Sequence, residues 1–559
     1  MTGAELLIEL LLEHDVDTIF GYPGGAVLPI YDALYDSPSI RHVLVRHEQA
    51  AVHAADGYAR VSGKPGVSLV TSGPGATNAI TGIANAYMDS VPMVVLTGQV
   101  PTQMIGLDSF QEVDIFGMTM SITKHNFMVL NIDDLPRIIS SAFHIAMTGR
   151  PGPVLVDLPK DVMTAQTGYT YAPTRSLLTP QLLKKYSCHT DIPVEQLKLI
   201  SDKLTMAKRP VVVIGGGCMA GETPKLLLQL MNRAQLPVVS TLMGLGAFPS
   251  QHPLHLGMLG MHGTVAANRA VQQADVLLCL GVRFSDRVAG NRQAFSSRSY
   301  KIQVDIEEAE LNKNIDIDLA VHGTTEAVLK GLLEHNLSGS WKDWNNEISH
   351  LSKRVPALPA VENSRLQPQD VIRFIHKQCA ENAIIATDVG QHQIWTAHNY
   401  PFSQPRTFVT SGGLGTMGFG LPAAIGAAIA CPGREVVCIS GDGSIQMNIQ
   451  ELMTAVDQNL NIKIVILTNG YLGMVRQWQQ LFHNKRYSSV KISSPAFPEL
   501  ARTFGASGYH ADNLSEAEQV IAQAWKKEGV VVMEFDIAEE MNVYPIIPPG
   551  ASPSEVIED

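Results

Sequence analysis

Two polar side chains each follow an apolar run in the C-terminal third of the chain. Asp442 stands between Gly441 and Gly443 after the run VVCIS, and Asn469 follows the run KIVILT. In an open parallel sheet, ligands bind outside the carboxyl ends of the strands, where both side chains would lie. A phosphate held by the glycine turn and the next helix needs a cation between it and Asp442. A carboxylate and an amide suit Mg²⁺, so the pair predicts a metal-bridged diphosphate anchor.

A Gly-Asp-Gly triplet on its own is also typical of a plain turn. Here it follows a predicted strand, opens a predicted helix, and Asn469 ends the next predicted strand. The chain has no G-x-x-x-x-G-K-[ST] motif, and the glycines at 215–217 lack the G-x-G-x-x-G spacing. The diphosphate anchor is therefore favoured over a plain turn and over these two nucleotide sites.

The composition predicts a multidomain soluble protein. The chain has 559 residues, of which 45% are apolar and 17% charged, and its net charge is −12. This charge argues against nucleic acid as a partner. The Glu-bearing leucine segment 1–20 predicts an amphipathic helix rather than a signal peptide, and no apolar stretch is long enough to span a membrane. The six scattered cysteines fit the cytoplasm and argue against a zinc site or a disulfide framework.

A strand–turn–helix–strand pattern occurs twice, at 67–98 and at 436–470. The alternation predicts parallel sheets with helical crossovers, and the repeat indicates duplication, although two unrelated doubly wound domains would give a similar pattern. Further strand-like runs predict a third α/β domain between the two. The predicted division is domains at 1–165, 191–345 and 370–545, linkers at 166–190 and 346–369, and an irregular tail at 546–559.

Several motifs together resemble one enzyme family. GDGS…TN resembles the thiamine diphosphate signature of the decarboxylase and carboligase superfamily. RHEQAAVHAADGYAR, TSGPGATN, GRPGPVLVDLPKDV, GMLGMHG, SGGLGTMGFGLPAA and GMVRQWQQLF resemble acetohydroxyacid synthase (acetolactate synthase) catalytic subunits of the biosynthetic type, over nearly the whole chain. The resemblance implies an α/β fold of three domains: the thiamine diphosphate-binding fold twice, around a Rossmann-like central domain.

The resemblance also implies a reaction. Pyruvate would be decarboxylated on thiamine diphosphate, and the two-carbon hydroxyethyl unit would pass to a second 2-oxo acid. Pyruvate as acceptor gives 2-acetolactate, and 2-oxobutanoate gives 2-aceto-2-hydroxybutanoate, the first common step of valine, leucine and isoleucine biosynthesis. The implied cofactors are thiamine diphosphate, Mg²⁺ and FAD. The implied assembly is a homodimer or tetramer, with a small regulatory subunit as a further partner.

The resemblance assigns Glu48 to cofactor activation, through a hydrogen bond to the aminopyrimidine ring. An exposed helix start with a capping role is the alternative, but the apolar residues after Glu48 argue for a buried site. The other implied contacts of thiamine diphosphate are Gly25, Val389, Gly390, Gln391, His392, Gly415, Met417, Gly441, Asp442, Gly443, Ser444, Asn469, Tyr471, Leu472, Gly473 and Met474. Asp442, Asn469 and Tyr471 are the implied metal ligands. For Met417, expected under the bend of the cofactor, a gap-filling core methionine is the alternative.

The acceptor pocket is implied to contain Trp478 and Met474, with Arg287 pairing with the acceptor carboxylate. Because Met474 and Trp478 are four residues apart, a core helix stripe is the alternative interpretation. Phe110, Gln111 and Lys160 resemble residues that line the same channel from the other subunit. Lys160 would otherwise be a solvated strand end.

The central domain resembles an FAD-binding domain, whereas related decarboxylases have a cofactor-free one. The implied contacts are Arg150, Gly215, Gly216, Gly217, Thr241, Leu242, Met243, Leu259, Gly260, Met261, His262, Gly281, Arg283, Arg287, Asp305 and Ile306. Two departures predict weaker flavin binding: Ser285 replaces the usual aspartate, and AVHGTT lacks the usual Gly-Asp. The rival functions are an FAD-independent catabolic acetolactate synthase, a pyruvate oxidase-like thiamine enzyme and a non-catalytic nucleotide-binding protein.

Overall fold

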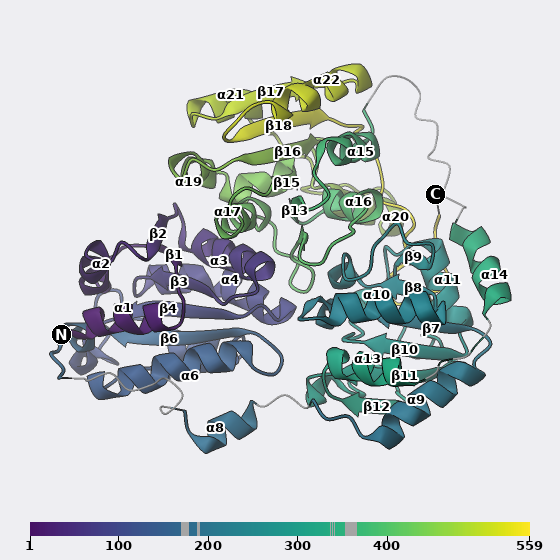
Figure 1. Ribbon diagram of the computed structural model, residues 1–559. Helices are drawn as coiled ribbons and strands as arrows, with labels where there is room; N and C mark the ends of the chain where they lie inside the picture. Colours follow the sequence, from purple (N-terminus) through teal and green to yellow (C-terminus); the bar gives the residue numbers. More distant parts are fainter. Residues whose placement is uncertain are drawn as a thin grey trace.

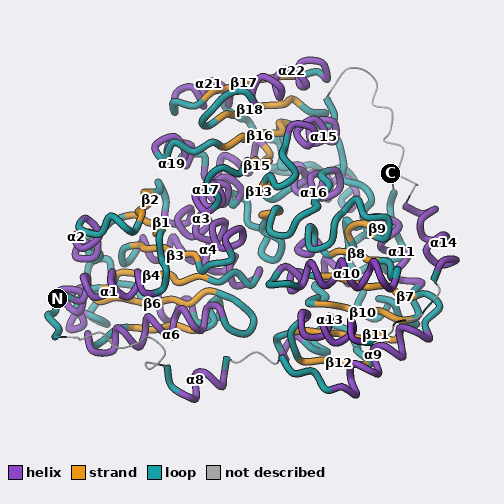
Figure 2. Tube along the Cα trace, in the orientation of Figure 1, coloured by secondary structure: helices purple, strands orange, loops and turns teal. Residues whose placement is uncertain are grey.

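The computed structural model contains three α/β bodies, each built on a six-stranded sheet in which every strand pair is parallel. Figure 1 shows the N-terminal body in purple and blue, the central body in teal, and the C-terminal body in green and yellow. Helices flank the sheets in all three (Figure 2). The structure describes residues 1–168, 178–186, 190–335, 337, 339, 341–352 and 366–558. This architecture confirms the predicted fold class.

The N-terminal sheet has the strand order β2-β1-β3-β4-β6-β5. Its central strands are buried β-branched runs, which is typical of a parallel sheet covered on both faces. The strands are β1 (Thr18–Tyr22), β2 (Arg41–Leu44), β3 (Gly66–Val70), β4 (Met93–Gln99), β5 (His125–Met128) and β6 (Pro153–Pro159). The helices are α1 (Gly3–Glu13), α2 (Leu28–Tyr35), α3 (Glu48–Ser62), α4 (Pro74–Asp89), α5 (Ile115–Thr119), α6 (Leu135–Met147) and α7 (Lys160–Thr164).

The C-terminal sheet has the order β14-β13-β15-β16-β18-β17, which repeats the order of the first sheet strand for strand. This agreement confirms two modules of one plan. The strands are β13 (Ile384–Thr387), β14 (Phe408–Val409), β15 (Val436–Gly441), β16 (Ile462–Thr468), β17 (Ser507–Ala511) and β18 (Val531–Asp536). The helices are α15 (Pro368–Gln378), α16 (Gln391–Asn399), α17 (Gly420–Ala430), α18 (Asp442–Ile445), α19 (Glu451–Asp457), α20 (Gly473–Phe482), α21 (Phe497–Thr503) and α22 (Leu514–Trp525).

The central sheet has the order β12-β11-β10-β7-β8-β9, the doubly wound order of dinucleotide-binding folds. Successive strands are added to one side from β7 to β9 and to the other side from β10 to β12, and such folds bind ligands at the point between β7 and β10 where this order reverses. The strands are β7 (Pro210–Ile214), β8 (Val238–Ser240), β9 (His255–Met258), β10 (Val276–Leu280), β11 (Tyr300–Asp305) and β12 (Leu319–His322). The helices are α9 (Val194–Met206), α10 (Thr223–Ala234), α11 (Val265–Gln273), α12 (Asp286–Ala289), α13 (Thr325–Glu334) and α14 (Lys342–Ser352).

The connecting segments differ in part from the expected linkers. Helix α8 (Pro180–Lys185) lies within 166–190, and α14 continues past residue 345, since Trp341, Trp344 and Ile348 pack into the central core. The rest of the expected linkers falls partly outside the described residues, as does Cys188. The C-terminal segment returns over the central body, where the Ile547 N–H donates to the Met261 carbonyl at 2.8 Å.

The two repeated modules pack through antiparallel helices α3 and α17. A Cβ at Gly57 would lie 2.1 Å from the Ala423 carbonyl oxygen, and one at Gly426 would lie 1.8 Å from that of Ala54. Glycine at both positions therefore permits close backbone contact. Residues of both modules form one continuous hydrophobic cluster around this pair.

Because α3 and α17 are antiparallel, the carboxyl edges of the two sheets lie at opposite ends of this helix pair. Each of α3 and α17 begins at the carboxyl edge of its own sheet, at Glu48 and Gly420. With a rise of about 1.5 Å per residue, these helix starts lie about 9 Å to either side of the Ala54–Gly426 contact, or about 18 Å apart. No helix within the described ranges has the length and apolar character needed to cross a membrane.

Candidate active site

Asp442 and Asn469 lie together at the carboxyl edge of the C-terminal sheet. Asp442 is 2% exposed, and its Oδ2 accepts from the Gly470 N–H at 2.9 Å. Asn469 Oδ1 accepts from the Tyr471 N–H at 3.0 Å, which orders the turn that carries the third implied ligand. The adjacent strands β15 and β16 bring the two side chains into one turn-lined recess.

The start of α16 closes one side of this recess. Gln391 Oε1 accepts from Asn469 Nδ2 at 3.5 Å, and a Cβ at Gly473 would lie 2.1 Å from the same oxygen. His392 packs against Gly441, whose added Cβ would lie 2.9 Å from Nδ1. Burial lowers the pKa of His392 to about 3, so its ring is neutral. Its buried Nε2 has no hydrogen-bond partner among the described residues, which leaves a polar atom available to a ligand.

The segment 411–420 carries Gly415 and Met417 to the same edge. Buried Asp388 accepts from the Gly418 N–H at 2.8 Å and the Gly420 N–H at 3.3 Å, and also from the Val389 N–H at 2.9 Å. A Cβ at Gly443 would lie 4.0 Å from Met417 Cε and 2.8 Å from Leu472 Cδ2. Met417 is half-buried and belongs to none of the hydrophobic clusters of the described residues, which argues against a gap-filling core methionine.

Two buried carboxyl groups, those of Asp442 and Asp388, lie at this recess. Burial raises the pKa of Asp442 and that of Asp388 to about 6 each, against an ordinary value near 3.8. A divalent cation would favour the ionised form of Asp442. No group of three or more His, Cys, Asp or Glu side chains that could bind a metal occurs in the described part of the chain. The donor set of one carboxylate, one amide and backbone oxygens fits Mg²⁺ that is shared with a diphosphate.

Glu48 lies at the carboxyl edge of the N-terminal sheet. It is the first residue of α3, after the cap His47, and is half-buried. Asn78 Nδ2 donates to Glu48 Oε2 at 3.0 Å, which fixes one carboxylate oxygen. A Cβ at Gly75 would lie 3.4 Å from Oε1, while Gly25 has open space around it on the same edge. The residues after Glu48, from Ala50 to Ala59, are buried, as the apolar sequence predicted.

Three further expected residues, Phe110, Gln111 and Lys160, also lie at the carboxyl edge of the N-terminal sheet. Gln111 has a φ of 58° and packs on Gly73, the residue before α4. Lys160 begins α7 directly after β6. Phe110 is 88% exposed, although it is a large apolar residue. These three residues and Glu48 therefore lie at one sheet edge, whereas Asp442, Asn469 and Met417 lie at the carboxyl edge of the other module, at the opposite end of the α3–α17 pair.

Helix α20 carries the expected acceptor residues with an unusual burial pattern. Its buried residues are Arg476 and Gln477, which bind the Met541 and Val543 carbonyls at 2.9 Å each. Trp478 is half-buried outside the hydrophobic clusters, and the Arg287 guanidinium carbon lies 5.5 Å from its ring centroid. The core-stripe interpretation therefore fails for Trp478. It holds in part for Met474, which packs against the C-terminal core.

Most of the expected flavin residues gather at the switch point of the central sheet. Gly215 and Gly217 contact Gly281 across β7 and β10: an added Cβ would lie 2.1 Å from the Gly281 oxygen and 2.8 Å from its Cα. Gly216 faces Met243 in the turn after Thr241 and Leu242. The Met261 N–H donates to the Arg287 carbonyl at 2.8 Å, which joins the 259–262 turn to α12. Buried His262 Nδ1 lacks a partner within the described residues.

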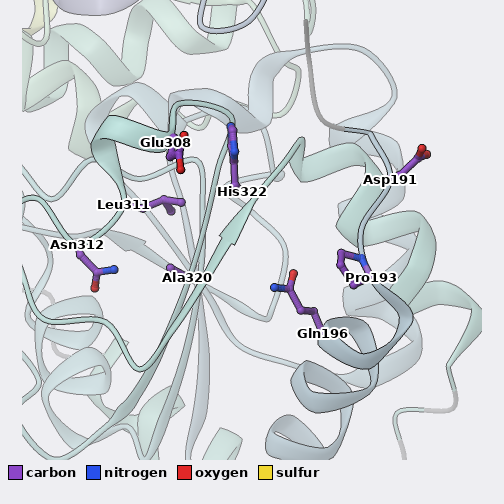
Figure 3. A pocket seen from close by; sticks show the side chains of 8 residues that line it. All are labelled: Asp191, Pro193, Gln196, Glu308, Leu311, Asn312, Ala320 and His322. Carbon is purple, nitrogen blue, oxygen red and sulfur yellow. The ribbon is translucent and has the colours of Figure 1, made fainter.

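The remaining expected contacts come from the end of β11, from the segment between β10 and α12, and from the N-terminal body. Burial raises the pKa of Asp305 to about 6, and burial lowers that of Arg283. Arg150 bridges to the central body through Glu310 at 2.9 Å. Ser285 is the residue before α12. Next to Ile306, a cavity of about 580 Å³ opens between the turn at Glu308, strand β12 and the start of α9 (Figure 3).

Three buried or partly buried polar residues at these edges were not expected as site residues. Asn78 orients Glu48, Asp388 holds the Met417 segment, and Glu451 binds the backbone just before Glu48. Asn78 ends the quoted motif TSGPGATN, and Asp388 directly precedes Val389, one of the expected cofactor contacts. Their roles depend on which turns meet in space, and the spacing along the chain does not give that.

Family models and full-length relatives identify the family of this chain. Three models of thiamine pyrophosphate enzymes match in order: the N-terminal TPP binding domain at 1–118, the central domain at 197–332 and the C-terminal TPP binding domain at 388–535. The chain is 43% identical to the acetolactate synthase large subunit of Haemophilus influenzae, over 100% of this chain and 98% of the relative.

Two further relatives come from other bacteria. The acetolactate synthase large subunit of Corynebacterium glutamicum is 44% identical over 100% of this chain and 90% of its own length. The acetolactate synthase isozyme 2 large subunit of Escherichia coli is 42% identical over the whole of both chains. With the three domain models in order and relatives above 40% identity from end to end, the chain belongs to the acetolactate synthase family of thiamine pyrophosphate enzymes.

Proposed function

We propose that this chain is the catalytic subunit of a biosynthetic acetolactate synthase that uses thiamine diphosphate, Mg²⁺ and FAD. It would join two molecules of pyruvate, with loss of CO₂, to 2-acetolactate, or join pyruvate to 2-oxobutanoate. The observation that carries the proposal is the pairing of two opposed half-sites, the Asp442–Asn469 recess and the Glu48–Asn78 edge, on two modules of one plan. Bound thiamine diphosphate supplies a carbon nucleophile and an electron sink.

The protein residues would position and activate this cofactor. Asp442 and Asn469 would hold Mg²⁺ and, through it, the diphosphate, with Gln391 and His392 lining the recess. Met417 would support the bent cofactor. Glu48 Oε1 would share a proton with the pyrimidine ring nitrogen while Asn78 fixes Oε2. Arg287 would bind the acceptor carboxylate beside Trp478, and Phe110, Gln111 and Lys160 would help to exclude water.

The opposed edges support a homodimer as the minimal active unit. Within one chain, Glu48 and Gly420 lie about 18 Å apart on antiparallel helices, so one chain would not place both half-sites on one cofactor. Two copies related by a two-fold axis would complete two sites, each with Glu48 from one copy and Asp442 from the other. The exposed Phe110 would then be covered by the second copy.

The FAD assignment rests on the glycine contacts at the β7–β10 switch point. Gly215, Gly217 and Gly281 let the turns after β7 and β10 pack closely at the point where doubly wound folds bind dinucleotides, and His262 Nδ1 offers a buried polar atom. The flavin would be structural, since the net reaction is not a redox one. The purified protein is expected to be yellow, and a colourless protein that is fully active would contradict the assignment.

Trp478→Leu is expected to keep acetolactate formation and to lose the preference for 2-oxobutanoate over pyruvate by about 10- to 200-fold, because one methylene group contributes that much in an apolar pocket. Both products are measured in competition between the two acceptors. Trp525→Leu, at the end of α22 against the C-terminal core, is the matched control. An unchanged product ratio in Trp478→Leu would show that Trp478 does not select the acceptor.

Two further observations support a regulatory partner and a cellular compartment for this chain. The relatives are named large subunits, which supports a separate small subunit as a regulatory partner of this chain. The five described cysteines are free, which supports a reducing compartment such as the cytoplasm.

An assay with pyruvate tests the proposed reaction. The protein with thiamine diphosphate and Mg²⁺ is expected to release CO₂ and to form acetolactate, and chelation of the metal is expected to stop both. Acetyl phosphate or hydrogen peroxide as the product would identify a pyruvate oxidase instead. If the dimer consumes no pyruvate, the protein is non-catalytic.

A further inference from the structure

A buried glutamate of the C-terminal module binds the segment that carries Glu48. Glu451 is the first residue of α19, and its side chain is 0% exposed. Its Oε1 and Oε2 accept from the Arg46 backbone N–H at 3.0 and 3.2 Å, and Oε2 also accepts from Thr454 Oγ1 at 2.7 Å. The bond to Arg46 spans two modules and lies two residues before Glu48.

This contact fixes where α3 begins. His47 is the cap of α3 and stands between Arg46 and Glu48, so a shift of the Arg46 backbone moves the cap and the carboxylate together. The Arg46 side chain makes a separate contact with Asp457 at the end of α19. The backbone and the side chain of Arg46 are therefore bound by different residues of one helix, and the two contacts can be removed one at a time.

A carboxylate of the N-terminal module binds the backbone of the C-terminal module in a similar way. Asp89, the last residue of α4 in the N-terminal module, accepts from the Gly412 and Gly413 N–H groups at 3.0 and 2.7 Å. These glycines begin the segment that carries Met417. Each module thus uses a carboxylate from the crossover after its third strand to hold the backbone that leads into the other module's site.

Simple packing does not explain a carboxylate at position 451. Burial raises the pKa of Glu451 to about 7 despite its hydrogen bonds, so the ionised form is costly there. An apolar side chain of similar size would fill the same space without this cost. What an apolar side chain would not supply is an acceptor for the Arg46 N–H.

We propose that Glu451 is a positioning residue for cofactor activation: by accepting from the Arg46 N–H, it holds Glu48 at the place where it meets the aminopyrimidine ring of the partner copy's cofactor. The inference rests on the proposed role of Glu48. It adds that the C-terminal module of each chain, besides binding its own cofactor, sets the activity of the neighbouring one.

The test measures exchange of the thiamine C2 proton for deuterium in the assembled, cofactor-loaded protein. This rate reports activation alone and does not depend on pyruvate binding. Glu451→Leu, which fills the space without an acceptor, is expected to slow exchange about 100-fold, the usual cost of a displacement of about 1 Å. The amide oxygen of Glu451→Gln still accepts one N–H. The exchange rate of this variant is expected to lie between those of Glu451→Leu and the unmodified protein.

Asp457→Asn is the matched control, because it weakens the Arg46 side-chain contact on the same helix and leaves the backbone contact in place. It is expected to exchange at the unmodified rate. KM for pyruvate is expected to stay within about twofold in all three variants, because Glu451 would act on activation and not on substrate binding.

The outcomes separate this inference from the proposed function. If Glu48→Gln exchanges at the normal rate, the role of Glu48 is wrong. If Glu48→Gln is slow while folded Glu451→Leu is normal, the positioning role alone is wrong. Should the Leu variant fail to fold, Glu451→Gln decides: exchange slower than in Asp457→Asn supports the inference, and equal rates overturn it.

Discussion

Glu48→Gln is expected to lower kcat for acetolactate formation by about 10²- to 10⁴-fold, the usual contribution of a positioned acid or base. The amide keeps the shape of the side chain and its contact with Asn78 Nδ2 through oxygen, but it does not stabilise a proton on the pyrimidine ring. Binding of thiamine diphosphate is expected to change little, because the diphosphate anchor lies on the other module. Steady-state rates and cofactor titration measure the two effects.

The control for Glu48→Gln is Glu516→Gln, which removes an acidic residue from the first turn of α22. Both substitutions lose the same favourable interaction with a helix N-terminus, worth about 0.3 to 1 kcal/mol. Only the change at Glu48 is expected to affect turnover. Equal activity of the two variants would mean that Glu48 does not activate the cofactor.

Asp442→Asn is expected to raise the Mg²⁺ concentration needed for half-maximal activity by more than about 100-fold, since even an outer-shell change costs about 10- to 100-fold in metal affinity. Asp442 supplies the only expected carboxylate ligand, and the amide of the variant carries no charge to balance the cation. The apparent affinity for thiamine diphosphate is expected to fall in parallel, because the metal links the diphosphate to the protein. Titration of each cofactor at saturating levels of the other gives both values.

Asp370→Asn is the control for this variant, because Asp370 lies in the first turn of α15 in the same module and pairs with Arg373. It is expected to keep the normal requirement for Mg²⁺. An Asp442→Asn protein that responds to Mg²⁺ and thiamine diphosphate as Asp370→Asn does would rule out the metal-bridged anchor.

The sequence was sufficient to predict the two repeated modules and the sheet edges at which the expected site residues lie. Apolar runs of β-branched residues, each followed by glycine or by Asn-Gly, identified β3, β4, β15 and β16, and the repeat of this pattern predicted two modules of one plan. The polar residues after these strands were then expected at the carboxyl edges, where Asp442 and Asn469 do lie. The local sequence predicts this position because the residue after a strand of a parallel sheet lies at the carboxyl edge of that sheet.

Local sequence patterns did not predict how the two proposed half-sites are oriented relative to each other. The opposed edges follow from the antiparallel contact of α3 with α17, which depends on Gly57 and Gly426 meeting Ala423 and Ala54 from the other module. Nothing in either helix alone specifies that partner. The expected homodimer came instead from the family resemblance, and the geometry of the helix pair now supplies a physical reason for it.

Hydrophobic periodicity alone would not have predicted the burial pattern of α20. Met474 and Trp478 are four residues apart, as in a core stripe, but the fully buried residues are Arg476 and Gln477. Their side chains bind backbone carbonyls of the 541–543 segment, so hydrogen bonding offsets their burial. A similar reason explains why Glu451 was missed, because its acceptor role depends on Arg46 from a distant part of the chain.

A mixed dimer tests most directly whether two chains share each cofactor. Chains with Glu48→Gln and chains with Asp442→Asn carry different tags, are produced together, and the dimers that hold both tags are isolated. Each pure variant is expected to be nearly inactive. The mixed dimer is expected to regain about half of the normal activity, since one of its two sites combines an intact Glu48 with an intact Asp442. A mixed dimer as inactive as its parents would contradict the account, because it would place both residues of each site on one chain.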